Sequence, residues 1–376
     1  MATPARRLRV GIVGAGLVAR VMHLHYLREM ADRFEIAAIC DLAPENAALC
    51  AEQFGIGRTF TDWREMLVEA LDAVLVLTSG SHAEIAVEAA RRGIHVLVEK
   101  PMCFSTAEGR AMVEAADVAG VVLMVGYMKR YDEAYLRFRE AVGSLADTRF
   151  VRVTTLEAPI APYVGHLDLG PSARPDAAVL DRLESEAEAA VTAAIGPEQD
   201  FGRAAYRGIL LDTLVHELNA VRGLLGEPDR LDWVDMQPGM VTVMLRFSEL
   251  PVAIHWVDLQ GIARYDMEIA AYSAERRLTL SFPSPFLRNE PTRLVIEDGD
   301  PGSPLARVTD QVTSYDSAFK RELVAFRAAI LDGEPIPTTG RDALADIALC
   351  EAIVHSYRTG APIDRPSSPS TAEVSS

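Results

Sequence analysis

The sequence predicts an α/β protein of two domains: a doubly wound parallel sheet at the N-terminus, then an α+β domain with a large, mainly antiparallel open sheet. Three observations lead to this prediction. Apolar strands alternate with helices in the first part of the chain, a glycine-rich turn follows the first strand, and later segments alternate apolar and polar residues. The expected divisions are 1–128, 129–364 with an insertion at about 166–206, and a disordered tail at 365–376.

Length and composition are typical of two globular domains. The chain has 376 residues, of which 24% are charged, and a formal net charge of -17. Such an acidic chain lacks the clustered Lys and Arg that neutralise phosphates, so we expect no nucleic-acid partner. No apolar run approaches the roughly 20 residues that cross a bilayer, and no signal peptide is evident, so we expect no membrane contact and a cytoplasmic location. The cysteines Cys40, Cys50, Cys103 and Cys350 lack ligand-like spacing, which indicates reduced thiols and no metal site.

The first domain is expected to consist of βαβ units. Segment 8–16 is a continuous apolar run ending in glycines, which suits a strand buried on both faces. A helix at 17–30 and a strand at 34–41 complete the first unit. The other expected elements of this domain are strands at 72–78, 93–101 and 121–127 and a helix at 82–93.

The second domain shows the two-residue alternation of antiparallel strands. Its insertion is rich in Ala, Glu and Asp, and we expect it to be a surface excursion that is helical around 178–194. The other expected elements are strands at 149–159, 240–247, 251–259, 265–273 and 276–282 and helices at 208–226, 317–333 and 341–360.

The turn after the first strand matches a dinucleotide-binding motif. Gly14, Gly16 and Ala19 fit the pattern G-x-G-x-x-G/A. The first glycine permits a tight turn, the second lets the backbone approach a pyrophosphate, and the small third residue permits close helix packing. Leu17 and Val18 open the helix, whose first N–H groups face the phosphates. The alternative is that these glycines only shape a turn.

Asp41 ends the second strand about 20 residues further on, where a carboxylate binds the ribose 2′-OH of the adenosine. Leu42 and Ala43 follow it, so no adjacent Arg is present to bind a 2′-phosphate. The motif therefore predicts a Rossmann domain that binds NAD rather than NADP. The alternative is that Asp41 only caps the following helix.

Asp212 and His216 interrupt an apolar stripe in the helix expected at 208–226. Residues four apart project from the same face of an α-helix, so the carboxylate and the imidazole share a small volume. Imidazole exchanges protons near neutral pH, as the interconversion of an alcohol and a ketone requires. The alternative is a local helix contact that has no role in chemistry.

Several motifs together resemble the Gfo/Idh/MocA oxidoreductases, whose members include glucose-fructose oxidoreductase and inositol dehydrogenases. E-K-P at residues 99–101 is followed far downstream by D-x-x-x-H at residues 212–216. The inositol dehydrogenase branch is the most similar in "GYMKRYD" and "DTLVHEL". Further matching motifs are "GIVGAG", "HAEIAVEAARRGIHVLVEKP" and "TTGRDALADIALCEAIVHSYRTG".

The resemblance implies a catalytic set of three residues. It makes His216 the acid/base, Asp212 a neighbour that orients substrate or tunes the pair, and Lys100 a cation near the reacting oxygen and the nicotinamide ribose. It also implies a cis Lys100–Pro101 bond and a homodimer or homotetramer joined through the open sheet. The other residues that it implies are Thr78, His82 and Glu99 for the cofactor and Arg130 and Tyr265 for the substrate.

The function predicted from these residues is hydride transfer between NAD and a secondary alcohol or ketone of a sugar, cyclitol or related polyhydroxylated ring. Leu156 and Ala158 stand where inositol dehydrogenases place polar side chains, which argues against inositol itself. Two alternatives stay open: a redox-neutral enzyme with tightly held NAD, and a non-catalytic dinucleotide-binding sensor. The acid/base pair argues against the sensor.

Overall fold

The computed structural model describes residues 6–145 and 147–368, which form two compact units. Unit 1 contains the residues up to Tyr127 together with Leu167–Gly196 and Phe319–Leu344. Unit 2 contains Met128–His166, Pro197–Ala318 and the residues from Ala345 onward. Unit 2 begins at Met128, whereas the second domain was expected to begin at residue 129. Two later segments differ from the expected division, since most of the insertion (Leu167–Gly196) and one C-terminal helix belong to unit 1.

Unit 1 contains a six-stranded parallel sheet in the order β3-β2-β1-β4-β5-β6, which confirms the predicted doubly wound sheet. The core strands β1 and β4 consist almost wholly of buried aliphatic residues because helices cover both faces of a parallel sheet. The strands are β1 Leu8–Val13, β2 Phe34–Cys40, β3 Thr59–Phe60, β4 Ala73–Val76, β5 His95–Val98 and β6 Leu123–Val125.

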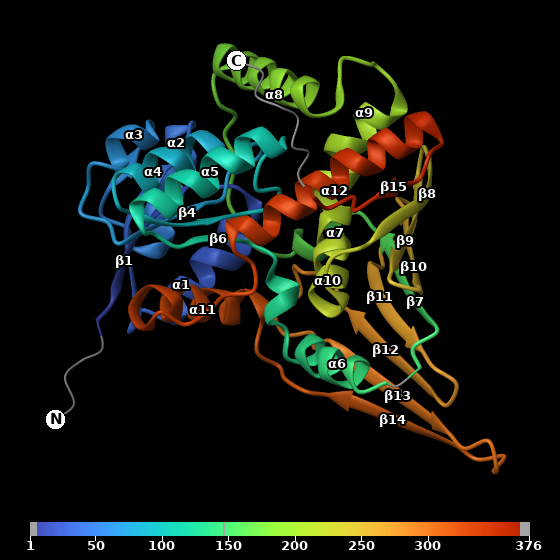
Figure 1. The fold of residues 1–376 in the computed structure, drawn as a ribbon. Helices are drawn as coiled ribbons and strands as arrows, with labels where there is room; N and C mark the ends of the chain where they lie inside the picture. Colours follow the sequence, from blue (N-terminus) through green and yellow to red (C-terminus); the bar gives the residue numbers. More distant parts are fainter. Residues whose placement is uncertain (1–5, 146, 369–376) are drawn as a thin grey trace. The chain divides into compact units, whose positions relative to one another are not determined.

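The helices of unit 1 follow the strands in alternation. A capping box starts one of them, α5, where the Ser105 hydroxyl accepts a hydrogen bond from the Glu108 N–H at 3.2 Å. The helix of the insertion, α8, packs against α5 (Figure 1). The helices are η1 Ala19–His23, α1 Leu24–Glu29, α2 Pro44–Phe54, α3 Trp63–Met66, α4 Ala83–Arg91, α5 Thr106–Ala119, α8 Ala177–Ile195 and α11 Ala318–Asp332.

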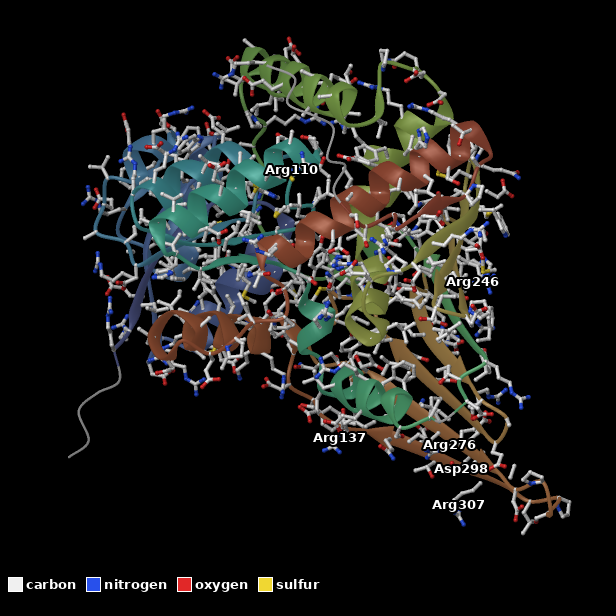
Figure 2. All side chains as sticks on the ribbon, in the orientation of Figure 1. Arg110, Arg137, Arg246, Arg276, Asp298 and Arg307 are labelled. Atoms are coloured by element: carbon white, nitrogen blue, oxygen red, sulfur yellow. The ribbon has the colours of Figure 1, made fainter. Side chains whose placement is uncertain are left out.

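Unit 2 contains a nine-stranded sheet in the order β14-β13-β12-β11-β7-β10-β9-β8-β15. Every neighbouring pair is antiparallel except β7 and β10, which confirms the mainly antiparallel sheet. Arg276 and Asp298 are cross-strand partners whose side chains pair at 2.6 Å (Figure 2). The strands are β7 Phe150–Glu157, β8 Arg230–Gln237, β9 Met240–Phe247, β10 Leu250–Asp258, β11 Asp266–Tyr272, β12 Arg276–Phe282, β13 Arg293–Gly299, β14 Ala306–Val312 and β15 Ile363–Asp364.

The helices of unit 2 lie on one side of this sheet, with α6 packed against β12 and β13 (Figure 1). Helix α12 begins in unit 1 and continues into unit 2 from Ala345. The helices are η2 Met128–Tyr131, α6 Glu133–Gly143, α7 Ala161–Val164, α9 Phe201–Ala205, η3 Tyr206–Leu214, α10 Val215–Leu225 and α12 Gly340–Thr359.

Two expectations need correction. The helix expected at 208–226 is π-helical over Tyr206–Leu214 and becomes α-helical only at Val215, because a stripe of leucines does not distinguish the two kinds of turn. The expected disordered tail is ordered at its start: Arg365 donates its N–H to the Asp229 carbonyl at 2.7 Å, and residues 365–368 form a turn. Residues 369–376 lie outside the described residues.

Candidate active site

The turn after β1 is shaped to hold a dinucleotide. Gly14 has a φ of +99°, and a Cβ there would lie 2.8 Å from the carbonyl carbon of Leu77. Gly16 is exposed, and a Cβ there would meet no atom within 4 Å. The helix then begins at Leu17. One glycine is therefore required by the fold and the next leaves room for a ligand, so this turn fits the pyrophosphate of NAD.

Asp41 joins the end of β2 to the glycine turn. Its carboxylate accepts hydrogen bonds from the Ala15 N–H at 2.8 Å and from the Ala43 N–H at 2.9 Å. The Asn46 carboxamide donates a third bond at 3.2 Å. An ionised carboxylate has about four acceptor positions, so these bonds orient Asp41 and leave acceptor capacity for a ribose hydroxyl.

Thr78 and His82 lie on the loop that follows β4. The two ring nitrogens of His82 lie 2.8 Å from the carbonyl oxygens of Thr78 and of Pro101. Burial lowers the pKa of His82 despite these carbonyl contacts. His82 is completely buried, so its contacts support a role in tying this loop to the E-K-P segment rather than a direct contact with the cofactor.

Glu99 and Lys100 follow β5, and the Lys100–Pro101 bond is cis as predicted. The Glu99 carboxylate is buried, lies 2.6 Å from Nε2 of His23 and accepts a hydrogen bond from the Lys100 N–H at 3.2 Å. Burial opposes its ionisation, but the hydrogen bond and charge of His23, with the charge of Lys100, lower its pKa overall. These contacts hold Glu99 in the interior, whereas the Lys100 side chain is half-buried.

The predicted acid/base pair lies in unit 2, at the change from π-helix to α-helix. Asp212 is exposed in the π-helical stretch, and His216 is half-buried in the first turn of α10. π-helical turns inside helices are frequent at functional sites. Lys100 belongs to unit 1, so its meeting with this pair stays a prediction.

Two basic residues of the "GYMKRYD" segment differ in their surroundings. Arg130 donates to the backbone carbonyl of Asn219 at 3.2 Å, and a Cβ at Gly223 would lie 2.3 Å from its guanidinium. This packing supports a structural role for Arg130 rather than the predicted substrate contact. Lys129, which the sequence reasoning missed, donates to the Tyr265 hydroxyl at 3.4 Å. The available signal was its position in the same motif, next to Arg130.

Carboxylates gather beside Lys129 and Tyr265. Glu217 is buried next to His216 in the chain and accepts a hydrogen bond from the Thr155 hydroxyl at 2.8 Å. Burial, and then the charge of Glu217, raise the pKa of Glu157 at the end of β7. Burial and both carboxylates raise the pKa of Tyr265 well above its usual value. Sequence reasoning missed both glutamates, although each interrupts an apolar pattern.

Two features are absent from the described residues, 6–145 and 147–368. None of their helices has the length and apolar character needed to span a bilayer. Their His, Cys, Asp and Glu side chains form no group of three or more that could hold a metal ion.

The doubly wound sheet, the glycine turn and Asp41 define a dinucleotide-binding protein. Residues 8–127 match the sequence model of the Gfo/Idh/MocA oxidoreductase family, described as having an NAD-binding Rossmann fold. Over these residues the chain is similar to the NAD-binding domain of that family, and over most of its length it is similar to inositol 2-dehydrogenases.

Known proteins of similar length resemble nearly the whole chain. A myo-inositol 2-dehydrogenase of Thermotoga maritima is 24% identical over 351 residues, which are 89% of this chain and 92% of that protein. An inositol 2-dehydrogenase of Rhizobium meliloti is 25% identical over 364 residues, 93% of this chain and 96% of that protein. A levoglucosan dehydrogenase solved with NADH and levoglucosan superposes with a TM-score of 0.74 at 19% identity, covering 96% of this chain and 100% of that one.

Proposed function

We propose that this protein is an NAD(H)-dependent dehydrogenase or reductase that interconverts a secondary alcohol and a ketone on a sugar, a cyclitol or a related polyhydroxylated ring. The observation that carries the proposal is the presence of two kinds of site in one chain. Unit 1 has a turn that fits a dinucleotide, and unit 2 has a half-buried histidine beside a cluster of buried polar residues.

The residues of unit 1 hold the cofactor in this proposal. Gly14 and Gly16 admit the pyrophosphate, the helix N-terminus at Leu17 and Val18 faces its charge, and Asp41 binds the ribose diol. NAD, when bound, accepts or supplies the hydride. Because Asp41 repels a 2′-phosphate, NADP is the weaker cofactor.

The residues of unit 2 and Lys100 act on the substrate. His216 takes the hydroxyl proton as the alcohol is oxidised and returns it in the reverse direction. Asp212 stabilises the protonated imidazole, and Lys100 stabilises negative charge on the reacting oxygen. Lys129 and Tyr265, which are already joined at 3.4 Å, present a cation and a hydroxyl to the remaining substrate oxygens.

The substrate class is supported by the relatives, whose names specify dehydrogenases of inositol, of D-apiose and of levoglucosan. All of these compounds are polyhydroxylated. Inositol is disfavoured because Leu156 is apolar and half-buried and Ala158 is buried, so neither side chain can satisfy a hydroxyl group.

A substrate screen tests the proposal. Polyols, sugars and amino sugars are incubated with the protein and either NAD or NADP while NADH or NADPH absorbance is followed. We expect turnover with a polyhydroxylated ring compound and a higher kcat/KM for NAD than for NADP. A protein that binds NAD but oxidises no alcohol and reduces no corresponding ketone would contradict the proposal and would be either a redox-neutral enzyme or a sensor.

A further inference from the structure

One part of the insertion lies across unit 1 just before α8. We call residues 167–176 the strap. They belong to unit 1, and Asp176 at their end caps α8 by accepting a hydrogen bond from the Ala178 N–H at 2.8 Å. Helix α8 packs in turn against α5, so the strap is held at its C-terminal end by a helix of the same unit (Figure 1).

Asn46 binds the strap through both halves of its carboxamide. Its Oδ1 accepts a hydrogen bond from the Ala173 N–H at 2.8 Å, and its Nδ2 donates to the Ala173 carbonyl at 3.1 Å. The Asn46 side chain is buried, and its residue lies in the first turn of α2. A donor and an acceptor on the same residue fix both the position and the direction of the strap.

Two more contacts keep the strap close to the same helix ends. The buried Arg20, in the first turn of η1, donates to the carbonyl of Leu169. Gly170 has a φ of +65°, and a Cβ there would lie 3.0 Å from the Leu49 side chain of α2. The strap therefore crosses the first turns of the helices that follow β1 and β2, where a doubly wound sheet binds the adenosine part of a dinucleotide.

Asn46 also connects the strap to the cofactor residue. The Nδ2 group that donates to Ala173 donates to Asp41 as well, at 3.2 Å. Asp41 itself is bonded to the glycine turn through Ala15. A continuous chain of hydrogen bonds thus runs from the glycine turn through Asp41 and Asn46 to the strap.

We propose that the strap is part of the NAD site and closes over the adenosine ribose, so that the cofactor enters and leaves only when the strap lifts. The proposal rests on the proposed role of Asp41. The contacts that hold the strap are all made by residues of this chain, so the strap closes without a cofactor. It therefore slows both the entry and the release of NAD. A residue that only supported Asp41 would instead change the release rate and leave entry unaffected.

Stopped-flow fluorescence of NADH measures both rates directly. Asn46→Ala removes the paired bonds to Ala173, and Gly170→Val lifts the strap from Leu49 without touching the Asn46–Asp41 bond. We expect each variant to raise the association and dissociation rate constants by about tenfold, because Asn46→Ala removes two hydrogen bonds to the strap and Gly170→Val adds a steric contact at a positive φ. The dissociation constant should change less than either rate.

Gly120→Val is the matched control. Gly120 also has a φ of +65°, but a Cβ there would meet no atom within 4 Å, so the variant has the same backbone strain without touching the strap. It should exchange NADH at the wild-type rates. Faster exchange in this control, unchanged rates in Gly170→Val, or a faster release alone in both test variants would overturn the proposal.

The variant Asp41→Ala distinguishes a failure of the strap proposal from a failure of the ribose-binding role proposed for Asp41. If Asp41 binds the ribose, this variant should have a larger equilibrium dissociation constant for NADH. If the dissociation constant stays at the wild-type value, the assigned role of Asp41 fails and the strap proposal fails with it. If affinity falls in Asp41→Ala while the strap variants exchange NADH at wild-type rates, only the strap proposal fails.

Discussion

At the scale of single residues, two charged residues that are adjacent in one sequence motif can have different roles. Their contacts in the folded protein show which role each has. Arg130 and Lys129 are adjacent in one motif, yet the first packs against Gly223 and the second bonds to Tyr265. Glu99 and Lys100 are likewise adjacent, but the Glu99 carboxylate is paired with His23 in the interior. Motif position alone therefore does not specify which side chain is available to a ligand.

Replacement of His216 by Ala should lower kcat by about 10²-fold to 10⁴-fold, the usual contribution of a general acid/base. NAD affinity should persist because Gly14 and Asp41 belong to unit 1. Asp212→Asn should cause a smaller loss and shift the pH–rate profile, because it removes a negative charge close in sequence to the imidazole. Near-normal turnover in His216→Ala would reduce the pair to a local helix contact.

The two glycines of the turn should respond differently to alanine. Gly14→Ala should lower the free energy of unfolding by about 1–3 kcal/mol, because the new methyl group meets the Leu77 backbone at a positive φ. Gly16→Ala should leave stability unchanged and weaken NAD binding, since its methyl group enters space that the protein leaves open. Urea unfolding and NADH titration measure the two effects. Equal stability losses would contradict this assignment.

At the scale of elements, buried charges join helices that are distant in the sequence. Asp346 of α12 accepts hydrogen bonds from Asn219 at 2.7 Å and from Arg222 at 2.6 Å, both on α10. The side chains of Arg222 and Asp346 are 2% and 0% exposed. Because the pair is buried, removal of Asp346 leaves Arg222 paired with Glu227, whose side chain is 54% exposed, in place of a fully buried carboxylate, and this costs more than the loss of a surface pair.

Asp346→Ala should therefore lower the free energy of unfolding by about 3–5 kcal/mol, the range for breaking a buried ion pair. The exposed pair of Arg341 and Asp117 provides the comparison, because its side chains are 72% and 60% exposed. Asp117→Ala should change stability by less than about 1 kcal/mol. Urea denaturation measures both effects. Similar losses in the free energy of unfolding for the two variants would contradict the prediction.

Glu322 of α11 is close enough to Glu99, at the end of β5, for the charge of Glu99 to affect its pKa. Its side chain is fully buried, and its two carboxyl oxygens have no hydrogen-bond partner among the described residues. Burial, and then the charge of Glu99, raise the pKa of Glu322 well above its ordinary value of 4.5. The folded protein therefore keeps a proton that the unfolded chain releases, and stability falls as the pH rises above that ordinary value.

Glu322→Gln removes this titration. The variant should become more stable relative to the wild type as the pH rises from about 5 to about 8, and the difference should shrink toward the acid end. Glu334→Gln is the control because Glu334 is exposed just beyond the same helix. Urea unfolding across this range measures the difference, and a difference independent of pH would contradict a buried, protonated Glu322.

At the scale of the whole molecule, one face of the nine-stranded sheet exposes a large aromatic side chain. Trp233 of β8 is 46% exposed. Its cross-strand partner is Met244 of β9, which in turn lies opposite Ala253 of β10. The helices of unit 2 lie on the other side of the sheet (Figure 1). An antiparallel sheet with such a face either tolerates an apolar patch or buries it against another subunit.

We expect the protein to be a homodimer or homotetramer joined through this face. Trp233→Glu should shift the molecular mass measured by light scattering toward the monomer, because it places a charge in the apolar patch. Arg307→Glu, on the outer strand β14 of the same sheet, is the control and should keep the wild-type mass. A wild-type protein that is a stable monomer at micromolar concentration would contradict the prediction.

The sequence by itself determined the elements whose cause is local. The apolar runs of β1 and β4, the alternation of β9 and the glycine turn were predicted because burial on two faces, burial on one face and positive φ each require particular residues in a short window. The two-residue strand β3 and the half-exposed β13 and β14 were missed because they are too short or too polar for a periodic pattern.

Only the tertiary structure decided which distant groups meet. Asn46 and Ala173 are 127 positions apart, and nothing in either neighbourhood indicates that the insertion docks beside Asp41. The burial of Glu322 near Glu99 and the separation of Arg130 from Lys129 likewise depend on how helices pack. Local patterns determine which face of an element is apolar, whereas the pairing and desolvation of polar side chains depend on contacts made only after the chain has folded.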